Sequence, residues 1–357
     1  MKAWEKNIRK VTPYVPGEQP KNTGIIKLNT NENPYPPAPG VLEALKKTDV
    51  DLLRRYPDPT ASALTEAIAE FYGVESDQVF VGVGSDDVLA MAFLTCFHSD
   101  KPILFPDITY SFYDVWAGLF RIPYEVQPLD EKFCICAEDY QKECGGIVFP
   151  NPNAPTGILK SLDEVEEIIC LHPDVIVIVD EAYIDFGGAS ALPLLKKYDH
   201  LLIAQTFSKS RSMAGMRIGF LLGNQELIRY INDCKYSFNS YTMNQTVITL
   251  GVEAIRDRAY FEQCRRTIIE TREWAKGEFH GLGFEFADSA ANFVFVTHPD
   301  YPAKEMFEAL KEAGIYVRHF SGPKRISNYL RITIGTREEM EALFAFLKQY
   351  MSKDWSM

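Results

Sequence analysis

The chain has 357 residues and a mass of 40.6 kDa, which exceeds one minimal domain and predicts about two packed domains with a large core. Hydrophobic residues make up 46% of the sequence and charged residues 24%, a composition that excludes a disordered chain. The net charge of −12 opposes a broad nucleic-acid-binding surface or a patch for an anionic membrane, while local basic sites for small anions remain compatible with it.

No targeting segment or disulfide framework is evident in the sequence. The first residues, MKAWEKNIRK, lack the apolar core of a signal peptide, and the longest apolar runs are far shorter than a membrane span. The 7 cysteines are odd in number and form no CxxC pair, so a zinc ribbon does not fit either. We therefore expect a cytoplasmic protein whose cysteines are reduced and mostly buried.

The first elements in chain order are an extended arm and a strand-turn-helix unit. Residues 12–40 are rich in proline, which excludes a regular helix or a central strand. Residues 61–73 predict a helix closed by Gly73, residues 78–84 a buried strand, and residues 85–97 a helix capped by Ser85.

Six further apolar runs predict strands, separated by helical stretches such as SLDEVEEIICL. They cover residues 101–105, 123–129, 145–150, 174–181, 200–207 and 216–223. Short buried strands that alternate with helices predict a doubly wound, mostly parallel α/β domain over residues 47–252. Ligand groups are then expected at the carboxyl ends of its strands.

The last third of the chain predicts a smaller α+β domain over residues 253–357. A long helical stretch over residues 244–279 leads into strands at 292–296, 314–320 and 329–335 and helices at 302–314 and 337–351. Residues 1–46 are expected to form an N-terminal arm and part of the small domain.

Polar residues gather in three loops that follow predicted strands. The segments are NPNAPTG at 151–157, DEAYIDF at 180–186 and TFSKSRSMAGMRIG at 206–219. Each has an ordinary explanation: the first loop as a plain turn, Asp180 as a helix cap, and Lys209 as a solvated lysine. Asp180, however, ends the apolar run VIVIVD, where a carboxylate needs a buried cationic or hydrogen-bond-donating partner.

Together with QVFVGVGSDD, these loops resemble the fold-type I pyridoxal-phosphate (PLP) aminotransferases in their order and spacing. The resemblance runs from NENP at 31–34 to LRITIGT at 330–336. Within that superfamily, LNTNENPYPP, RRYPDP and YLRITIGTREE most resemble the histidinol-phosphate aminotransferases. The resemblance implies a mixed, mostly parallel sheet sandwiched by helices, with a smaller α+β domain. It also implies a homodimer, PLP as cofactor, and amino transfer between L-histidinol phosphate and 2-oxoglutarate in histidine biosynthesis.

The resemblance assigns the ring end of the cofactor to five side chains. Lys209 would hold the cofactor and shuttle a proton, while Asp180 would keep the pyridine nitrogen protonated. Asn153 and Tyr183 would donate hydrogen bonds to the ring oxygen, and Tyr110 would stack on the ring face.

The phosphate end calls for backbone donors at a helix start and a planar cation. By the resemblance, the phosphate ligands are Gly84, Ser85, Asp86, Thr206, Ser208 and Arg217, with Tyr56 reaching across from the partner subunit.

On the substrate side, Arg331 matches the arginine that receives the carboxylate of the amino donor, and Arg318 matches a second arginine. An arginine on an exposed strand face is the alternative, but the apolar neighbours of Arg331 favour an internal anion partner. Tyr14, and Asn239 together with Tyr241, are expected near the substrate.

Other functions are also compatible with parts of the sequence. GVGS alone fits many nucleotide-binding folds, but the full GxGxxG fingerprint of a dehydrogenase is absent. An aromatic aminotransferase or a threonine-phosphate decarboxylase would share the same cofactor residues. A PLP-sensing regulator would carry an added DNA-binding domain. Charges at Lys324 and Arg325 would either alter phosphate binding or solvate a loop. The histidines show no ligand spacing, so no metal is expected.

Overall fold

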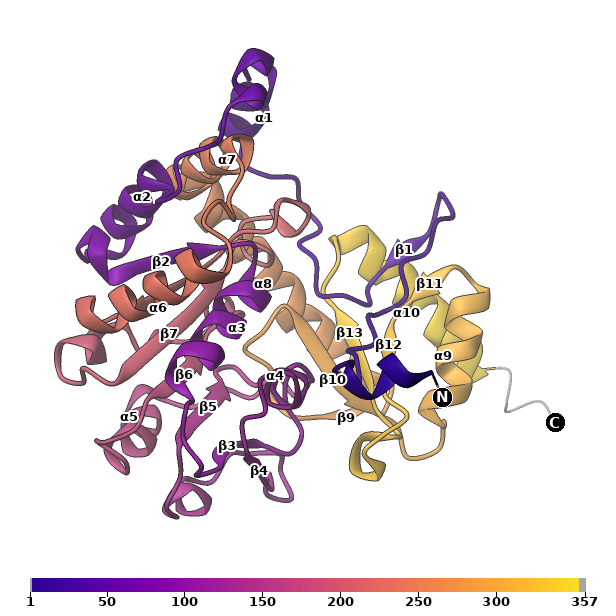
Figure 1. Ribbon diagram of the computed structural model, residues 1–357. Coiled ribbons are helices and arrows are strands. Elements are labelled where there is room, and N and C mark those ends of the chain that lie inside the picture. Colours follow the sequence, from indigo (N-terminus) through magenta and orange to yellow (C-terminus); the bar gives the residue numbers. More distant parts are fainter. Residues whose placement is uncertain (1, 353–357) are drawn as a thin grey trace.

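Seven strands lie side by side in the large sheet, in the order β2-β8-β7-β6-β5-β3-β4 (Figure 1). In this computed structural model, which describes residues 2–352, β8 is antiparallel to β2 and β7, and the other pairs are parallel. The prediction of a mixed, mostly parallel sheet is therefore confirmed. The bounds of β2 to β8 are Val79–Gly82, Ile103–Pro106, Tyr124–Gln127, Gly146–Pro150, Val177–Asp180, Leu201–Thr206 and Gly219–Gly223.

Helices cover both faces of this sheet, which is why its inner strands are continuous apolar runs. Alternate residues of one strand enter different cores: Phe149 belongs to one hydrophobic cluster and Val148 to another. The first cluster includes side chains of α2 (Ser62–Tyr72), α5 (Leu162–Cys170) and α7 (Gln245–Arg256). The second includes side chains of α3 (Ser85–Cys96), α4 (Tyr113–Phe120) and α6 (Gln225–Phe238).

The register of the three central strands brings their carboxyl ends to one edge. Pro150 at the end of β5 pairs with Asp180 at the end of β6, and Asp180 pairs with Ala204 of β7. The loops that follow these strands therefore start at the same level of the sheet, as expected for the ligand-binding edge of such a fold.

A smaller α+β layer lies beside the large sheet. It contains the antiparallel order β12-β13-β10-β9 and a parallel pair of β1 with β11. Strands β1 and β9 to β13 span Ile26–Lys27, Glu285–Phe286, Phe293–Thr297, Ile315–Tyr316, Arg318–His319 and Leu330–Thr333. Helices α8 (Arg258–Gly281), α9 (Ala303–Glu312) and α10 (Arg337–Ser352) enclose its separate hydrophobic core.

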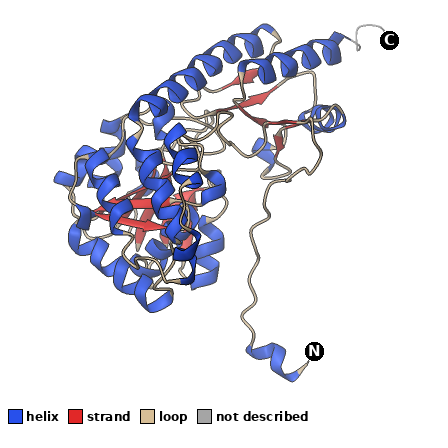
Figure 2. Cartoon of the chain, turned by 90° about the horizontal axis from the view of Figure 1, so that it is seen from above, coloured by secondary structure: helices blue, strands red, loops and turns tan. Residues whose placement is uncertain are grey.

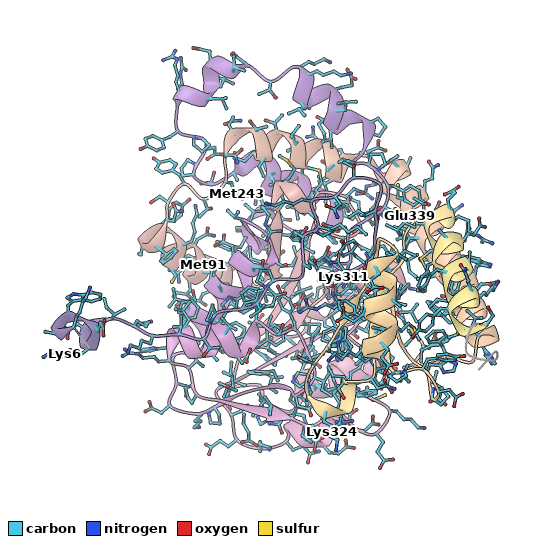
Figure 3. All side chains as sticks on the ribbon, turned by 90° about the vertical axis from the view of Figure 1, so that its right-hand side faces the viewer. Lys6, Met91, Met243, Lys311, Lys324 and Glu339 are labelled. Carbon is cyan, nitrogen blue, oxygen red and sulfur yellow. The ribbon has the colours of Figure 1, made fainter. Side chains whose placement is uncertain are left out.

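The N-terminal arm extends away from the body of the molecule. A short 3-10 helix, η1 (Ala3–Asn7), stands apart from both layers in Figure 2 and precedes a long segment without regular structure. This segment contacts the large layer where Tyr14 stacks on Phe112 and Arg9 donates to the Leu119 carbonyl oxygen. Lys6 accordingly lies apart from the other side chains in Figure 3. Helix α1 (Pro39–Lys46) and the 3-10 helix η2 (Val50–Arg54) follow at the top of Figure 1, where α1 contacts α7.

Three local predictions are wrong. The long helix expected over 244–279 is broken at Asp257, which has a non-helical backbone. The Asp257 carboxylate caps α8 because it accepts a hydrogen bond from the Tyr260 backbone amide. The strand expected at 314–320 is two short strands, because β11 pairs with β1 and β12 pairs with β13. Ser85 is the first residue of α3 rather than its cap, a position that Gly84 takes.

The cysteines and the helices add two observations about residues 2–352. All seven cysteines are free thiols, but only Cys144 and Cys264 are buried, so the expectation of mostly buried thiols is wrong. Within this described part of the chain, no helix is long and apolar enough to cross a membrane.

Candidate active site

A cavity of about 330 Å³ opens at the carboxyl edge of the central strands. Eight residues predicted for the cofactor line it: Ser85, Asp86, Tyr110, Asp180, Tyr183, Ser208, Lys209 and Arg217. They come from the loops after β2, β3, β6 and β7 and from the turn before β8, because the aligned strand ends deliver these loops to one place.

Lys209 lies in the loop after β7 and is held by contacts with the segment that follows β1. Its Nζ donates a hydrogen bond of 3.1 Å to the carbonyl oxygen of Thr30 and lies 5.6 Å from the ring centre of Tyr183. Asn33 Nδ2 donates to the backbone oxygens of Lys209 and Ser210. The amine therefore faces the cavity from a fixed backbone.

Asp180 is a buried carboxylate whose partners are neutral donors. The hydroxyl of Tyr113 donates to Oδ2 at 3.0 Å, and the amide of Ala182 donates to Oδ1 at 3.1 Å. Burial raises the pKa of Asp180 to about 6 in spite of these two hydrogen bonds. A cationic ring nitrogen bound next to Asp180 would supply the countercharge that the carboxylate otherwise lacks.

The opposite end of the cavity is built to receive an anion. Helix α3 begins at Ser85, and its first amides have no acceptor within the helix. Gly84 has a φ of +88°, and a Cβ there would lie 2.4 Å from Nη2 of Arg217, so only glycine lets the guanidinium approach. Arg217 itself has a φ of +56°, an unusual backbone for arginine that often marks a functional position.

Asp86 ties this anion-binding end to the aromatic wall of the cavity. Its Oδ2 accepts from Nη2 of Arg217 at 3.0 Å, and its Oδ1 accepts from the Tyr110 hydroxyl at 2.5 Å. Beneath them, the Thr206 hydroxyl donates to the Ser208 hydroxyl at 2.9 Å. Four predicted phosphate-site side chains are thus brought together with Tyr110.

The two residues expected at the ring oxygen differ in position, because Tyr183 lines the cavity and Asn153 does not. The Tyr183 hydroxyl accepts from Nδ2 of Asn31 at 2.9 Å. The amide of Asn153 donates to the carbonyl oxygen of Ile108 at 2.9 Å and to the Thr156 hydroxyl at 3.2 Å. Because both N–H groups of Asn153 are used within the protein, its expected contact with a ring oxygen stays a prediction.

A second cavity, of about 180 Å³, shares Thr30, Tyr110, Ala154, Tyr183 and Lys209 with the first. It also reaches Tyr14, Arg318 and Arg331, the predicted substrate side chains. Tyr14 is held there by stacking on Phe112 at 4.1 Å between ring centres.

Arg331 is a partly buried cation that has a hydrogen-bond donor to spare. Nη2 donates to the carbonyl oxygen of Asn29 at 3.2 Å, whereas the buried Nε has no partner among residues 2–352. The rings of Phe293 and Phe320 flank the guanidinium, and burial lowers the pKa of Arg331. Arg318 lies opposite it in the β12–β13 register. Two adjacent arginines with an unused donor form a site for an anion.

Several predicted residues line neither cavity: Gly84, Asn153 and Thr206 adjoin residues that do, whereas Tyr56 and Asn239 lie elsewhere. Tyr56 is 82% exposed and stacks on Tyr241 at 4.6 Å between ring centres. Asn239 ends α6, and its side chain accepts from the amide of Tyr241. Neither lines the Lys209 cavity of its own chain, so the expectation that Asn239 contacts substrate finds no support within one chain.

Sequence reasoning missed two supporting residues. Asn31 is buried at a φ of +56° and joins the site to β13, since its amide donates to the Thr333 hydroxyl. The polar run NTNEN between apolar and proline-rich stretches was a usable signal for Asn31. Tyr113, the partner of Asp180, had no signal that separated it from the other tyrosines. The residues described contain no group of three or more potential metal ligands.

Comparisons with known proteins agree with this geometry. The family "Aminotransferase class I and II" matches residues 23–347. The chain is 49% identical over 352 residues to histidinol-phosphate aminotransferase of Clostridium botulinum (strain Okra / Type B1), covering 99% of each chain. It is 51% identical over 342 residues to the enzyme of that name from Pseudomonas syringae pv. syringae, covering 96% of this chain and 97% of the relative.

The fold is also found among solved structures. The crystal structure of histidinol-phosphate aminotransferase from Sinorhizobium meliloti in complex with pyridoxal-5'-phosphate has a TM-score of 0.81 at 21% identity, with 91% of both chains covered. At that identity the likeness concerns the fold.

Proposed function

The chain belongs to the class I and II aminotransferases, and from this premise we propose that it acts on histidinol phosphate with PLP as its cofactor. It transfers an amino group between L-histidinol phosphate and 2-oxoglutarate, giving imidazole acetol phosphate and L-glutamate, a step of histidine biosynthesis. Relatives of that name, about half identical over nearly the whole chain, support this substrate pair.

The residues around the larger cavity fit PLP. Arg217, the Ser208 hydroxyl and the first amides of α3 would hold its phosphate, and Asp180 would pair with its ring nitrogen. Tyr110 would cover the ring face. When bound, PLP supplies an electron sink for the bond that breaks at the substrate Cα.

Lys209 is the proposed catalytic base and acid. Its Nζ would hold the cofactor until the substrate amine displaces it, and the freed amine would then take up the proton from the substrate Cα and give a proton back to complete the transfer. Within the described chain, Nζ donates to the Thr30 carbonyl oxygen, a neutral acceptor that leaves the lone pair of the free amine available. Asp180 stays ionised opposite the ring nitrogen and moves no proton.

The observation that carries the substrate proposal is the partly buried Arg331, which shares a cavity with Lys209 and has a buried Nε without a partner among the described residues. Histidinol phosphate brings a phosphate and glutamate brings a carboxylate, so one anion site must accept both in alternate half-reactions. Arg318, next to Arg331 in the sheet, provides the second cation that the larger phosphate charge requires.

We further propose a homodimer. Exposed apolar side chains gather on α1, η2 and the end of α6, namely Leu42, Leu45, Val50, Leu52, Leu53, Tyr56 and Phe238. A patch of this kind marks a protein interface. In the dimer, the Tyr56 hydroxyl reaches the cofactor phosphate of the other subunit. The domain division at residues 46 and 252, and a cytoplasmic location, belong to the same proposal.

The visible spectrum of the protein with PLP tests the proposed function. Low concentrations of histidinol phosphate, and glutamate, should bleach the absorbance band of bound PLP, while L-phenylalanine acts weakly. Absence of the band would contradict the cofactor assignment. If phenylalanine bleached the band as effectively as histidinol phosphate, or if threonine phosphate released CO₂, the PLP site would stand but histidinol phosphate would be the wrong substrate.

Arg331→Gln separates substrate binding from cofactor binding. We expect KM for both amino donors to rise about ten- to a hundredfold, because a charge-assisted contact is lost, with an unchanged PLP dissociation constant. Arg337→Gln, at an exposed arginine of α10, is the control. Unchanged glutamate kinetics in Arg331→Gln would reject the anion-site assignment.

A further inference from the structure

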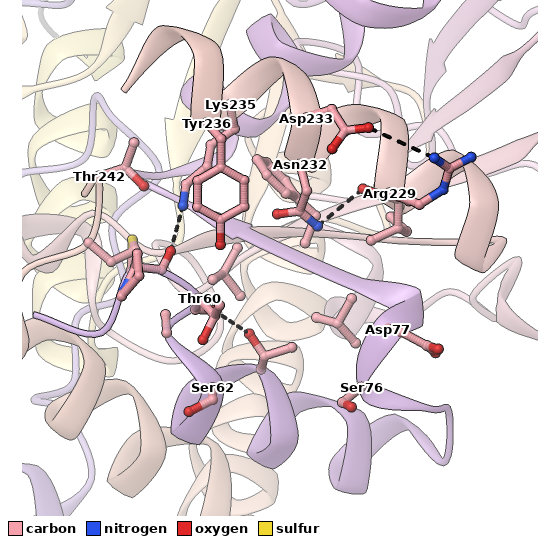
Figure 4. Close-up of a pocket in the computed structure, with 18 of the residues that line it drawn as sticks. Thr60, Ser62, Ser76, Asp77, Arg229, Asn232, Asp233, Lys235, Tyr236 and Thr242 are labelled. Carbon is pink, nitrogen blue, oxygen red and sulfur yellow. Dashed lines mark hydrogen bonds and ion pairs between the residues drawn. The ribbon is translucent and has the colours of Figure 1, made fainter. Parts of the chain in front are cut away.

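A buried lysine lies at the wall of a separate cavity of about 620 Å³ between α2 and α6. Lys235 points from α6 toward the loop before α2 (Figure 4) and is only 5% exposed. Its Nζ donates to the carbonyl oxygens of Pro59 at 2.5 Å and Ser240 at 2.9 Å and lies 4.1 Å from the ring centre of Tyr236. The ammonium thus joins two loops that are far apart in sequence.

The first of these loops is rigid at its base. The Asp58 carboxylate accepts from the amide and hydroxyl of Thr60 and from the amide and hydroxyl of Ser62, which fixes it at the start of α2. Pro59, the residue that Lys235 holds, lies between these partners. Tyr56 lies only two residues before Asp58, so its backbone position depends on this anchored base.

The second loop connects α6 with α7 and carries Tyr241. Lys235 fixes Ser240, the residue before it, and the ring of Tyr241 stacks on the ring of Tyr56. Both rings are exposed, as is the neighbouring Phe238 at 72%. A buried cation therefore supports a pair of aromatic rings that the described part of their own chain leaves open to solvent.

We propose that Lys235 is a positioning residue for the active site of the other subunit, acting through Tyr56. This inference rests on the proposed function. The buried ammonium holds the two loops so that the Tyr56 ring presents its hydroxyl to a second copy of the chain. Lys235 lines neither active-site cavity, and its two hydrogen bonds go to the loops that carry Tyr56 and Tyr241, so its proposed effect on the cofactor passes between subunits.

The first test compares PLP dissociation constants of single and double variants. Lys235→Met and Tyr56→Phe should each raise the PLP dissociation constant about tenfold. The double variant should bind PLP as tightly as the weaker-binding single variant, because both substitutions remove the same contact. Lys276→Met, which removes a lysine of α8 that is also largely buried, is the matched control and should change PLP affinity less than about twofold. Additive losses in the double variant would overturn the proposal.

Hybrid dimers give the decisive test. Lys235→Met and Lys209→Ala chains are co-expressed with different tags, and the mixed dimer is purified through both. Its only competent lysine belongs to the Lys235→Met chain, while the Tyr56 that serves that site comes from the chain with an intact Lys235. The PLP concentration that gives half-maximal turnover of the mixed dimer should therefore equal that of the wild-type protein.

The outcomes separate the two proposals. PLP affinity in the hybrid as weak as in the Lys235→Met homodimer would mean that Lys235 acts within its own chain, which overturns this inference alone. Turnover by the Lys209→Ala homodimer would contradict the proposed function instead. If Lys235→Met does not fold, Lys235→Gln, whose shorter amide reaches one carbonyl at most, replaces it in the same comparison.

Discussion

Two charged side chains of the site, Asp180 and Arg331, have no countercharge of their own among the described residues. Asp180 has two neutral donors, and within the described chain Arg331 has one carbonyl and an unused Nε. Both charges are costly to bury without a countercharge. A cationic ring bound at Asp180, or an anion bound at Arg331, would supply the missing countercharge. Part of the binding free energy would then come from removing the desolvation cost that these charges impose on the folded chain.

The pH dependence of the PLP-free protein tests this view of Asp180. Its pKa is raised to about 6, so the folded chain binds a proton that the unfolded chain has released, and stability falls as pH rises from about 4 through 6. We expect PLP-free Asp180→Asn to unfold at a higher temperature than the parent at pH 7, with the difference vanishing near pH 4. Asp174→Asn, at an exposed aspartate before β6, should show no such difference. A constant difference at all pH values would contradict the explanation.

At the scale of elements, strand ends were predictable and strand pairings were not. Asp180 stood out because it ends a long apolar run, which is a local signal, whereas Lys209 was assigned from the family resemblance. The β1–β11 pair joins segments almost 290 positions apart, and neither two-residue strand has a pattern of its own. Tyr113 was missed for the same reason, since its role depends on the distant Asp180 side chain that lies next to it in the fold.

Arg325 shows how the two layers are held relative to each other. It lies in the 3-10 helix η8 (Lys324–Ile326) of the small layer, yet it donates to the carbonyl oxygens of Leu129 and Asp130 beside the large sheet. Its Nη1 is 3.7 Å from the Asp107 carboxylate. The sequence suggested phosphate binding or simple solvation for this arginine; the structure shows neither, but a connection between layers.

Removal of this connection should loosen the substrate arginines relative to Lys209. We expect Arg325→Met to raise KM for both substrates about fivefold, the effect of about 1 kcal/mol at a partly exposed contact, with PLP affinity unchanged. Lys324→Met, at the exposed neighbour labelled in Figure 3, is the control. Substrate KM values equal to those of the parent enzyme would show that the layers keep their positions without Arg325.

At the scale of the whole molecule, a group of exposed apolar side chains lies on α1, η2 and the end of α6, away from the two active-site cavities. Composition indicated a folded, acidic protein but contained no trace of this patch, because single leucines on a surface are common and only their grouping in space is informative. The proposed dimer rests on the family resemblance and on this patch, since local sequence patterns gave no sign of it.

Charge introduced into this patch should dissociate the protein. Leu53→Glu, at a side chain that is 62% exposed, is expected to shift sedimentation from twice the chain mass to the chain mass and to make specific activity fall on dilution. Val126→Glu, at an exposed valine on the edge strand β4, should leave both measurements unchanged. Full activity of a monomeric Leu53→Glu protein would reject the shared site.

The pairing of β1 with β11 has a consequence for synthesis. The segment that holds Lys209 Nζ follows β1 and leaves the ribosome early, but it is locked by β11 and by the Thr333 amide, which donates to the Leu28 carbonyl oxygen. All seven strands of the large sheet precede β11 in the chain. A nascent chain can therefore complete its central sheet while the cavity around Lys209 stays open, and Lys209 is enclosed only when translation is nearly finished.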